Sequence, residues 1–181
     1  MAATGAGVRY VALLRGVNVN GVTVRSADLK ALFESLHFGQ VGTVLASGNV
    51  VFDAHEDVAR LKKRIEAGLR ERFGYDAWIV LATQQQVAAM AAAYPFAPRD
   101  ASHHPYLVFF SSAAVLADLS AQAGALASPE EQLAAGDGVL YWEVSVGNST
   151  ETPVSKLLAK ARYKPEITTR NLRTVEKIIA A

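Results

Sequence analysis

Two short polar stretches have the residue types that bind a small anion. They are Arg15, Gly16 and Asn18, which follow the apolar run 10–14, and Ser47, Gly48 and Asn49, which stand between two β-prone runs. A guanidinium fork, amide side chains, a hydroxyl group and glycine backbone N–H groups together suit a phosphate or a carboxylate. We therefore expect an anion site here if the fold brings the two stretches together.

The first half of the chain has the pattern of a ferredoxin-like unit. The expected elements are strands at 8–15, 41–46, 50–53 and 77–81, with helices that begin at 26 and 57 and end at Gly39 and Gly74. Apolar β-prone runs indicate the strands, and apolar residues at helical spacing indicate the helices. The order β-α-β-β-α-β is typical of this unit. In it, the end of the first strand and the start of the third meet at one edge of the sheet, so the two polar stretches share that edge.

The same residues also have a purely structural interpretation. Gly48 and Asn49 suit a tight hairpin turn, Gly16 suits a bend, and Arg15 suits a paired surface charge. The sequence leaves both interpretations open.

The first strand is apolar on both of its sides. Tyr10, Ala12 and Leu14 alternate with Val11 and Leu13. A strand with this pattern is usually covered on both faces. We therefore expect the rest of the chain, or a partner chain, to cover the second face of the sheet.

The second half predicts the order α-β-α-β-β-α-α. The expected strands are 105–110, 132–135 and 140–146, and Thr168 or Thr169 is expected to cap the last helix. The predicted fold class is therefore α+β, with a ferredoxin-like N-terminal half and a smaller, loosely similar α/β C-terminal half. The expected parts are a disordered tail at 1–7, a ferredoxin-like subdomain at 8–82, and a C-terminal subdomain at 83–181 that ends in two helices.

Basic and amide residues near the end of the chain form a second candidate cluster. Its members are Lys156, Arg170 and Asn171, within a segment rich in Lys and Arg. An Arg at the start of a helix lies where the helix dipole disfavours positive charge. This pattern indicates either a binding role or a structural carboxylate partner.

Several classes of protein are excluded or disfavoured. The 181 residues are 51% hydrophobic and 19% charged, so they can fill a core. Because the sequence contains no cysteine, it can form neither a disulfide nor a thiolate metal site. The histidines lack metal-ligand spacing, and no P-loop, dinucleotide fingerprint or nucleophile elbow occurs. We expect no metal and no cofactor, and the catalytic residues, if there are any, are unknown. No apolar run has the length of a membrane span, so a cytoplasmic protein without membrane contact is expected.

Five short motifs resemble a known family. They are residues 10–19 (YVALLRGVNV), 47–52 (SGNVVF), 95–96 (PF), 155–157 (SKL) and 169–171 (TRN). Together they are similar to the bacterial family catalogued as domain of unknown function 1697. The resemblance implies a two-part α+β protein with a ferredoxin-like half, and it implies no activity because the family has none assigned. Asn20 and Leu172 depart from the glycine and the aromatic residue that the family usually has there.

The function expected from these residues is binding of a small anionic or phosphorylated ligand at the edge formed by Arg15–Asn18 and Ser47–Asn49. Whether the protein is an enzyme is open. The alternatives are a nucleic-acid-binding module that uses the basic C-terminal helices and a dimerising structural or regulatory protein.

Overall fold

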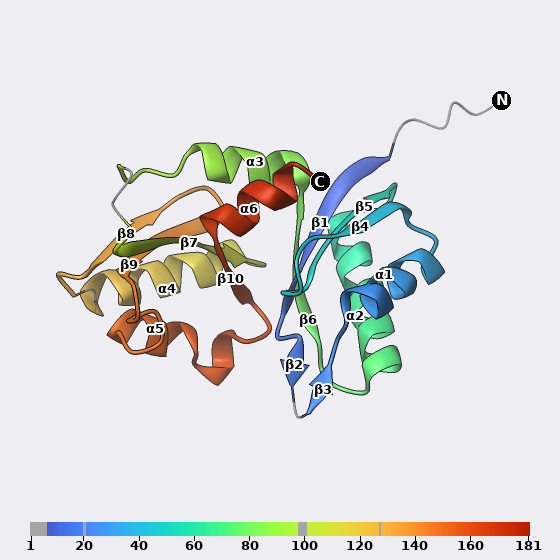
Figure 1. Ribbon diagram of the computed structural model, residues 1–181, viewed down its shortest axis with the longest axis horizontal. Helices are drawn as coiled ribbons and strands as arrows, with labels where there is room; N and C mark the ends of the chain where they lie inside the picture. Colours follow the sequence, from blue (N-terminus) through green and yellow to red (C-terminus); the bar gives the residue numbers. More distant parts are fainter. Residues whose placement is uncertain (1–6, 20, 98–100, 127) are drawn as a thin grey trace. The chain divides into compact units, whose positions relative to one another are not determined.

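The chain folds into two compact units. The computed structural model describes residues 7–19, 21–97, 101–126 and 128–181, so the predicted tail at 1–7 lies, apart from Gly7, outside the described residues. The first unit comprises Met1–Val87 together with Lys177–Ala181, and the second comprises Ala88–Glu176 (Figure 1). The first unit is therefore built from two separate stretches of sequence.

The first unit has the predicted ferredoxin-like order. Its elements are β1 (Val8–Arg15), α1 (Ser26–Ser35), β4 (Gly39–Thr43), β5 (Asn49–Ala54), α2 (Val58–Phe73) and β6 (Trp78–Thr83). The sheet has the strand order β4-β5-β1-β6, and each adjacent pair is antiparallel. A short ribbon of β2 (Asn18–Val19) and β3 (Val22–Thr23), which the sequence did not predict, follows β1.

Helices α1 and α2 cover one face of this sheet. The apolar stripe of α2 is Leu61, Ile65 and Leu69, and all of it is buried against the core that contains Tyr10 and Leu14. Burial of each such side chain stabilises the fold by about 1.5–3 kcal/mol. The Asp57 carboxylate caps α2 by accepting a hydrogen bond of 3.0 Å from the Arg60 N–H.

Both faces of β1 are buried, as its apolar pattern predicts. Leu14 on the helix-covered face and Leu13 on the opposite face are each only 1% exposed. Val11, which shares its face with Leu13, is fully buried. The prediction that the second face of the sheet is covered is therefore confirmed.

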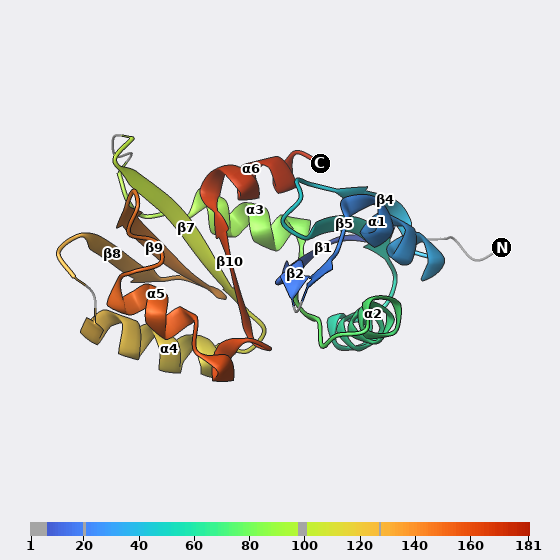
Figure 2. The same ribbon diagram turned by 60° about the horizontal axis from the view of Figure 1, so that its bottom comes forward.

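The second unit repeats the topology of the first more closely than the sequence predicted. Its elements are β7 (His103–Phe110), α4 (Ala113–Leu126), β8 (Glu131–Ala135), β9 (Val139–Ser145), α5 (Pro153–Leu158), the single 3₁₀ turn η1 (Ala161–Tyr163) and β10 (Ile167–Asn171). The sheet order is β10-β7-β9-β8. Its first, second, third and fourth strands thus occupy the same relative positions as in the first unit. Helices α4 and α5 pack on one face (Figure 2).

The expected helix cap at Thr168 or Thr169 is wrong. Residues 167–171 form β10, which pairs with β7 in the register Thr169↔Val108. The residue that caps α6 (Leu172–Ile179) is Asn171, whose Oδ1 accepts a hydrogen bond of 2.9 Å from the Arg173 N–H. Threonine is common both in strands and at helix caps, which is why the pattern was ambiguous. Arg170 therefore lies in a strand, not at a helix start.

Each ferredoxin-like set of strands is followed directly by a helix. Helix α3 (Gln84–Ala92) begins where β6 ends, and α6 begins where β10 ends. The last residues of α6 belong to the first unit, where the Gln84 side-chain amide donates hydrogen bonds of 3.0 Å to the carbonyl oxygens of Ile178 and Ala181. This amide thus ties the end of the described chain to the start of α3.

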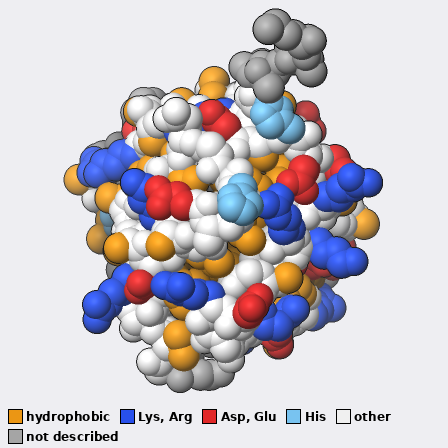
Figure 3. All heavy atoms as spheres, turned by 90° about the vertical axis from the view of Figure 1, so that its right-hand side faces the viewer, with side chains coloured by type: hydrophobic (Ala, Val, Ile, Leu, Met, Phe, Trp, Pro, Cys, Tyr) orange, Lys and Arg blue, Asp and Glu red, His pale blue; other side chains and the backbone are white. Residues whose placement is uncertain are grey.

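The surface over α1 and α2 carries charges of both signs (Figure 3). They form ion pairs that include Lys62–Glu66 at 2.6 Å, Arg70–Asp76 at 2.9 Å and Arg72–Asp28 at 3.8 Å. Such surface pairs contribute about 0–1 kcal/mol each, so this face is a solvated surface of mixed charge. Among the described residues, none of the helices has the length and apolar character needed to cross a membrane.

Candidate functional site

The topology places the two polar stretches of the first unit side by side. The Leu14 N–H at the end of β1 donates a hydrogen bond of 2.8 Å to the carbonyl oxygen of Gly48, in the loop between β4 and β5. Arg15 and Gly16 therefore lie at the same edge of the sheet as Ser47–Asn49.

Asn49 and Gly48 both stabilise the conformation of that loop. Asn49 is fully buried, and its Nδ2 donates hydrogen bonds of 2.8 Å to the Val44 carbonyl oxygen and to Ser47 Oγ. Gly48 has a φ of +77°, and a Cβ there would lie 2.6 Å from Val17 Cγ1. These contacts support the structural interpretation of both residues.

The remaining residues of this edge differ in exposure. Ser47 and Gly16 are exposed, and the Gly16 carbonyl oxygen accepts a hydrogen bond of 3.2 Å from the Tyr75 hydroxyl. Arg15 is half-buried, and desolvation lowers the pKa of its guanidinium from the usual value. Asn18 lies in β2, but its side chain is outside the described part of the structure.

The predicted residues of the second unit have three different environments. Lys156 is exposed on α5. Arg170 is 8% exposed, and its Nη1 donates hydrogen bonds to Thr168 Oγ1 at 2.6 Å and to the Thr169 carbonyl oxygen at 2.9 Å. Burial lowers the pKa of the Arg170 guanidinium to about 10. Asn171 caps α6 and lines a cavity.

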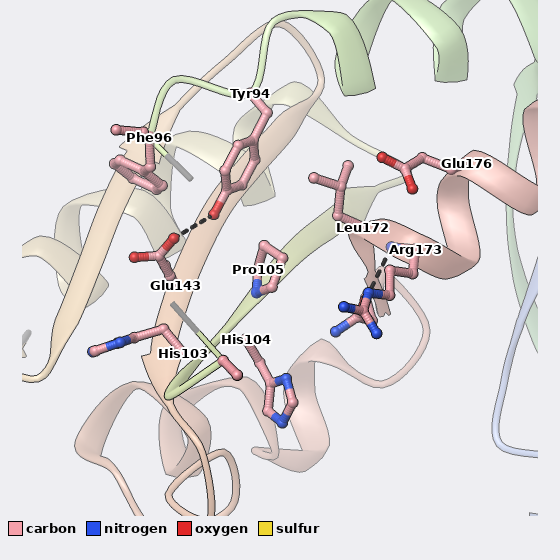
Figure 4. A pocket seen from close by; sticks show the side chains of 12 residues that line it. Tyr94, Phe96, His103, His104, Pro105, Glu143, Leu172, Arg173 and Glu176 are labelled. Carbon is pink, nitrogen blue, oxygen red and sulfur yellow. Dashed lines mark hydrogen bonds between the residues drawn. The ribbon is translucent and has the colours of Figure 1, made fainter. Parts of the chain in front are cut away.

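This cavity in the second unit has a volume of about 660 Å³ (Figure 4). That volume is within the range of sites for small molecules. The walls come from the segment after α3, the start of β7, the middle of β9 and the first turns of α6. The lining residues are Tyr94, Phe96, Ala97, Ala101, His103, His104, Pro105, Glu143, Asn171, Leu172, Arg173 and Glu176. We call this cavity the second-unit pocket.

A buried carboxylate forms one side of the second-unit pocket. Glu143 on β9 is only 3% exposed, and its Oε2 accepts a hydrogen bond of 3.0 Å from the Tyr94 hydroxyl. The Tyr94 ring is perpendicular to the rings of Phe96 and Tyr141, with centroids 5.4 and 5.8 Å away. The aromatic contacts hold Tyr94 in place, and Tyr94 in turn orients the carboxylate.

A guanidinium and an imidazole lie across the pocket. Arg173 projects from the first turn of α6, and His104 projects from the start of β7 (Figure 4). Arg173 is exposed and has no ion pair within the part of the chain that the structure describes. The His104 ring lies edge-on to Tyr106, with ring centroids 6.1 Å apart.

Sequence reasoning did not select Tyr94, His104 or Glu143 as a site, whereas Arg173 lies in the Lys- and Arg-rich segment of the second candidate cluster. One available signal was Glu143, which is the only charged residue in the strand sequence VLYWEVS. A charge in a buried strand requires compensation and often has a function. Tyr94 and His104 lie too far from Glu143 and Arg173 in the sequence for any spacing rule to connect them.

A second cavity, of about 490 Å³, lies in the first unit near His37, His55 and Arg64. The Arg64 guanidinium pairs with Glu56 and stacks over the Phe38 ring at 4.8 Å from its centroid. Its charge is therefore already matched, and this cavity is the weaker candidate. Among the described residues, no group of three or more His, Asp or Glu side chains could hold a metal ion.

Comparison with known proteins identifies the fold and the family. The conserved bacterial protein SP0830 from Streptococcus pneumoniae has the same fold, with a TM-score of 0.77 and 24% sequence identity over 96% of this chain and 97% of that chain. None of the curated proteins matches the sequence. The family model described as "Protein of unknown function (DUF1697)" matches residues 8–141, which is most of the chain. The resemblance seen in the short motifs is thereby confirmed, and the chain belongs to the DUF1697 family.

Proposed function

We propose that the protein binds a small ligand with an anionic group, and that this ligand occupies the second-unit pocket. The observation that carries the proposal is Arg173, an exposed guanidinium on the wall of a cavity of about 660 Å³. An arginine fork binds carboxylates and phosphates through two parallel hydrogen bonds. The first turn of α6 adds the positive end of a helix dipole, which favours an anion at the same place.

The rest of the wall suits a small organic molecule. Phe96, Pro105 and Leu172 offer apolar surface, while Tyr94 and His104 offer polar groups. Pockets for small molecules typically combine such a largely apolar lining with a few polar groups that orient the ligand. Asn171, one of the residues predicted from the sequence, lies on the same wall.

The edge formed by Arg15–Asn18 and Ser47–Asn49 is the second candidate site for the anion. The hydrogen bond between Leu14 and Gly48 supports it, because this bond brings the two polar stretches together. Because the buried Asn49 amide serves the loop, the side chains proposed to contact a ligand at this edge are those of Arg15 and Ser47.

The nucleic-acid alternative has less support. Arg170 is 8% exposed and lies within a sheet, so its guanidinium is not placed for contact with a phosphate backbone. The Arg162 guanidinium stacks on the Tyr163 ring, with 4.7 Å between the guanidinium carbon and the ring centroid. A basic footprint would need such residues together on an open face.

Binding measurements with matched variants test the proposal. Inorganic phosphate, sugar phosphates, nucleotides and small carboxylates are screened by thermal shift, and each stabilising compound is titrated by calorimetry. We expect Arg173→Gln to weaken binding by about tenfold or more, because one charge-assisted contact is lost. Lys177→Gln, an exposed cation on the same helix that does not line the pocket, is the control and is expected to leave the affinity unchanged.

The variants also separate the two candidate sites. If Arg15→Gln removes binding and Arg173→Gln does not, the ligand binds at the edge formed by Arg15–Asn18 and Ser47–Asn49, which we call the first-unit edge. If no compound of the panel stabilises the wild-type protein, the proposal of an anionic ligand is wrong.

A further inference from the structure

Two polar side chains from different elements lie at the same end of a strand pair in the second unit. The pairing of β10 with β7 reaches Asn171, which lies opposite Tyr106, and α6 begins at the next residue. Arg173 follows Asn171 by two residues, in the first turn of α6. His104 precedes Tyr106 by two residues on β7, which runs antiparallel to β10. The strand register therefore brings His104 and Arg173 to one end of the pair, where both line the second-unit pocket.

The His104 ring and the Arg173 guanidinium point into the same part of this pocket. In Figure 4 both extend below Pro105, whereas the Glu143 carboxylate lies to the left of Pro105. That carboxylate accepts a hydrogen bond from the Tyr94 hydroxyl, so Glu143 belongs to the structure of the opposite wall. The part of the pocket below Pro105 is thus lined by one guanidinium and one imidazole from two separate elements.

The donors of these two side chains suit a phosphoryl group. A guanidinium fork binds two oxygens of an anion through parallel hydrogen bonds. A carboxylate has only those two oxygens, whereas a phosphate monoester has three terminal oxygens that accept hydrogen bonds. The third oxygen can accept a hydrogen bond from an imidazole N–H, which histidine has in its neutral form as well as in its protonated form.

A carboxylate close to Arg173 leaves the guanidinium accessible. Glu176 is exposed and stands one helical turn beyond Arg173 on α6. In Figure 4 its carboxylate points away from the guanidinium, which projects from the other side of the helix. Because water screens an exposed charge, Glu176 reduces the attraction of Arg173 for an anion only in part.

We infer that the ligand is a phosphate monoester. Arg173 binds two oxygens of its phosphoryl group, His104 binds the third, and its organic part lies against the apolar surface of Pro105 and Leu172. The inference rests on the proposed function, because it names the class of the anionic ligand at the same pocket. It adds a role for His104 and a preference for phosphate over carboxylate, which anion binding alone does not require.

Probes that share one apolar ring test this inference. They are phenyl phosphate, phenylacetate and the uncharged 2-phenylacetamide, with inorganic phosphate as the probe that lacks an organic part. Affinities are measured by calorimetry for the full-length wild-type protein and for His104→Leu and Arg173→Gln. Leucine keeps much of the volume of the histidine side chain but has no N–H donor. The control variants are Lys177→Gln and His55→Leu, at exposed positions that do not line the second-unit pocket.

We expect the wild type to bind phenyl phosphate about tenfold or more tightly than phenylacetate, because one further charge-assisted hydrogen bond is made. His104→Leu should weaken phenyl phosphate by about tenfold and change the affinity for phenylacetate by less than about twofold. Arg173→Gln should weaken both anions and remove the preference for phenylacetate over its amide. The two control variants should bind all probes as the wild type does.

The possible failures are distinguishable. If His104→Leu weakens phenyl phosphate and phenylacetate equally, His104 has only a structural role and the inference is wrong. It is also wrong if inorganic phosphate binds as tightly as phenyl phosphate, because the organic part then makes no contact. Should His104→Leu not fold, His104→Ala, which also lacks the donor, takes its place.

The wild type alone separates this inference from the proposed function. If phenyl phosphate binds no more tightly than phenylacetate, and binding of phenylacetate depends on Arg173, the inference is wrong and the proposed anion site stands. If no probe binds, the inference is wrong, and the broader anion panel decides the proposed function.

Discussion

The Tyr94 hydroxyl donates a hydrogen bond of 3.0 Å to the Glu143 carboxylate, although the two residues are 49 positions apart in the sequence. The bond joins the segment after α3 to the middle of β9. It therefore holds one wall of the second-unit pocket against the sheet and fixes the direction of a buried charge.

Tyr94→Phe tests the energy of this bond. Hydrogen bonds to charged groups contribute about 1.5–3 kcal/mol, so we expect the free energy of unfolding to fall by about that amount. Urea denaturation provides the measurement. Tyr106→Phe is the control, because the Tyr106 hydroxyl has no hydrogen bond to the described residues while its ring stacks on Trp142 at 5.2 Å. Equal losses in the two variants would contradict the role given to the Tyr94 hydroxyl.

Tyr141 predicts a dependence of stability on alkaline pH. Burial, and to a lesser extent the charge of Asp137, raises the pKa of Tyr141 above its usual value of 10.0. The hydroxyl also donates a hydrogen bond of 2.7 Å to the Met90 carbonyl oxygen, which requires the protonated form. Because the folded state holds this proton more tightly, the contribution of Tyr141 is complete below pH 10 and is lost as the pH rises through the folded-state pKa.

We therefore expect the free energy of unfolding of the wild type to fall more steeply than that of Tyr141→Phe as the pH rises above about 10. Chemical denaturation at a series of pH values measures both slopes. A parallel decline of wild type and variant would show that Tyr141 does not carry the effect.

Gly48→Ala tests the close approach at the first-unit edge. The new Cβ would lie 2.8 Å from Leu14 Cβ and 2.6 Å from Val17 Cγ1, in a left-handed backbone conformation. We expect a loss of about 2 kcal/mol or more in the free energy of unfolding, from steric overlap and backbone strain together. Gly74→Ala is the matched control, since its φ of +73° is similar and a Cβ there meets nothing within 4 Å.

The control should lose only about 1 kcal/mol, the cost of the left-handed conformation alone. The difference between the two variants, measured by thermal or urea unfolding, isolates the steric term. If Gly48→Ala is no worse than Gly74→Ala, the loop relaxes without cost.

Asn49→Ala separates a structural role from a binding role. Its amide donates to the Val44 carbonyl oxygen and to Ser47 Oγ inside the loop, and the residue is fully buried. We expect the variant to lose about 1–3 kcal/mol of stability in the absence of any ligand. Ser47→Ala, at an exposed position, should cost clearly less. Unchanged stability with weakened anion binding would favour the ligand-binding interpretation of Asn49.

The order of the elements in the first unit could be predicted because the local signals agree. The apolar stripe of α2, its Asp57 cap and its Gly74 stop lie within one segment of sequence. Strand β10 was missed because its evidence is not local. Ile167 pairs with Phe110, far away in the sequence, while the residues Thr168–Asn171 alone suit a helix start as well as a strand.

The sequence could predict the position of candidate residues in the sheet, because strand order determines it, but it could not predict their side-chain contacts. The order of strands places Arg15 and Ser47 at one edge, independently of the conformation of their side chains. That the Asn49 amide is used within its own loop depends on distances of a few ångströms, which no pattern contains. The second-unit pocket is assembled from segments between Tyr94 and Glu176, and their meeting follows from the pairing of β7 with β9 and β10.

The division of the first unit between two stretches of sequence has a consequence for synthesis on the ribosome. Residues 177–181 emerge after the whole of the second unit, yet they belong to the first, where Gln84 binds their backbone. Domains that are continuous in sequence usually fold in the order in which they are made. In this chain synthesis of the first unit begins before that of the second but ends after it. The second unit can therefore fold before the last residues that belong to the first unit have been made.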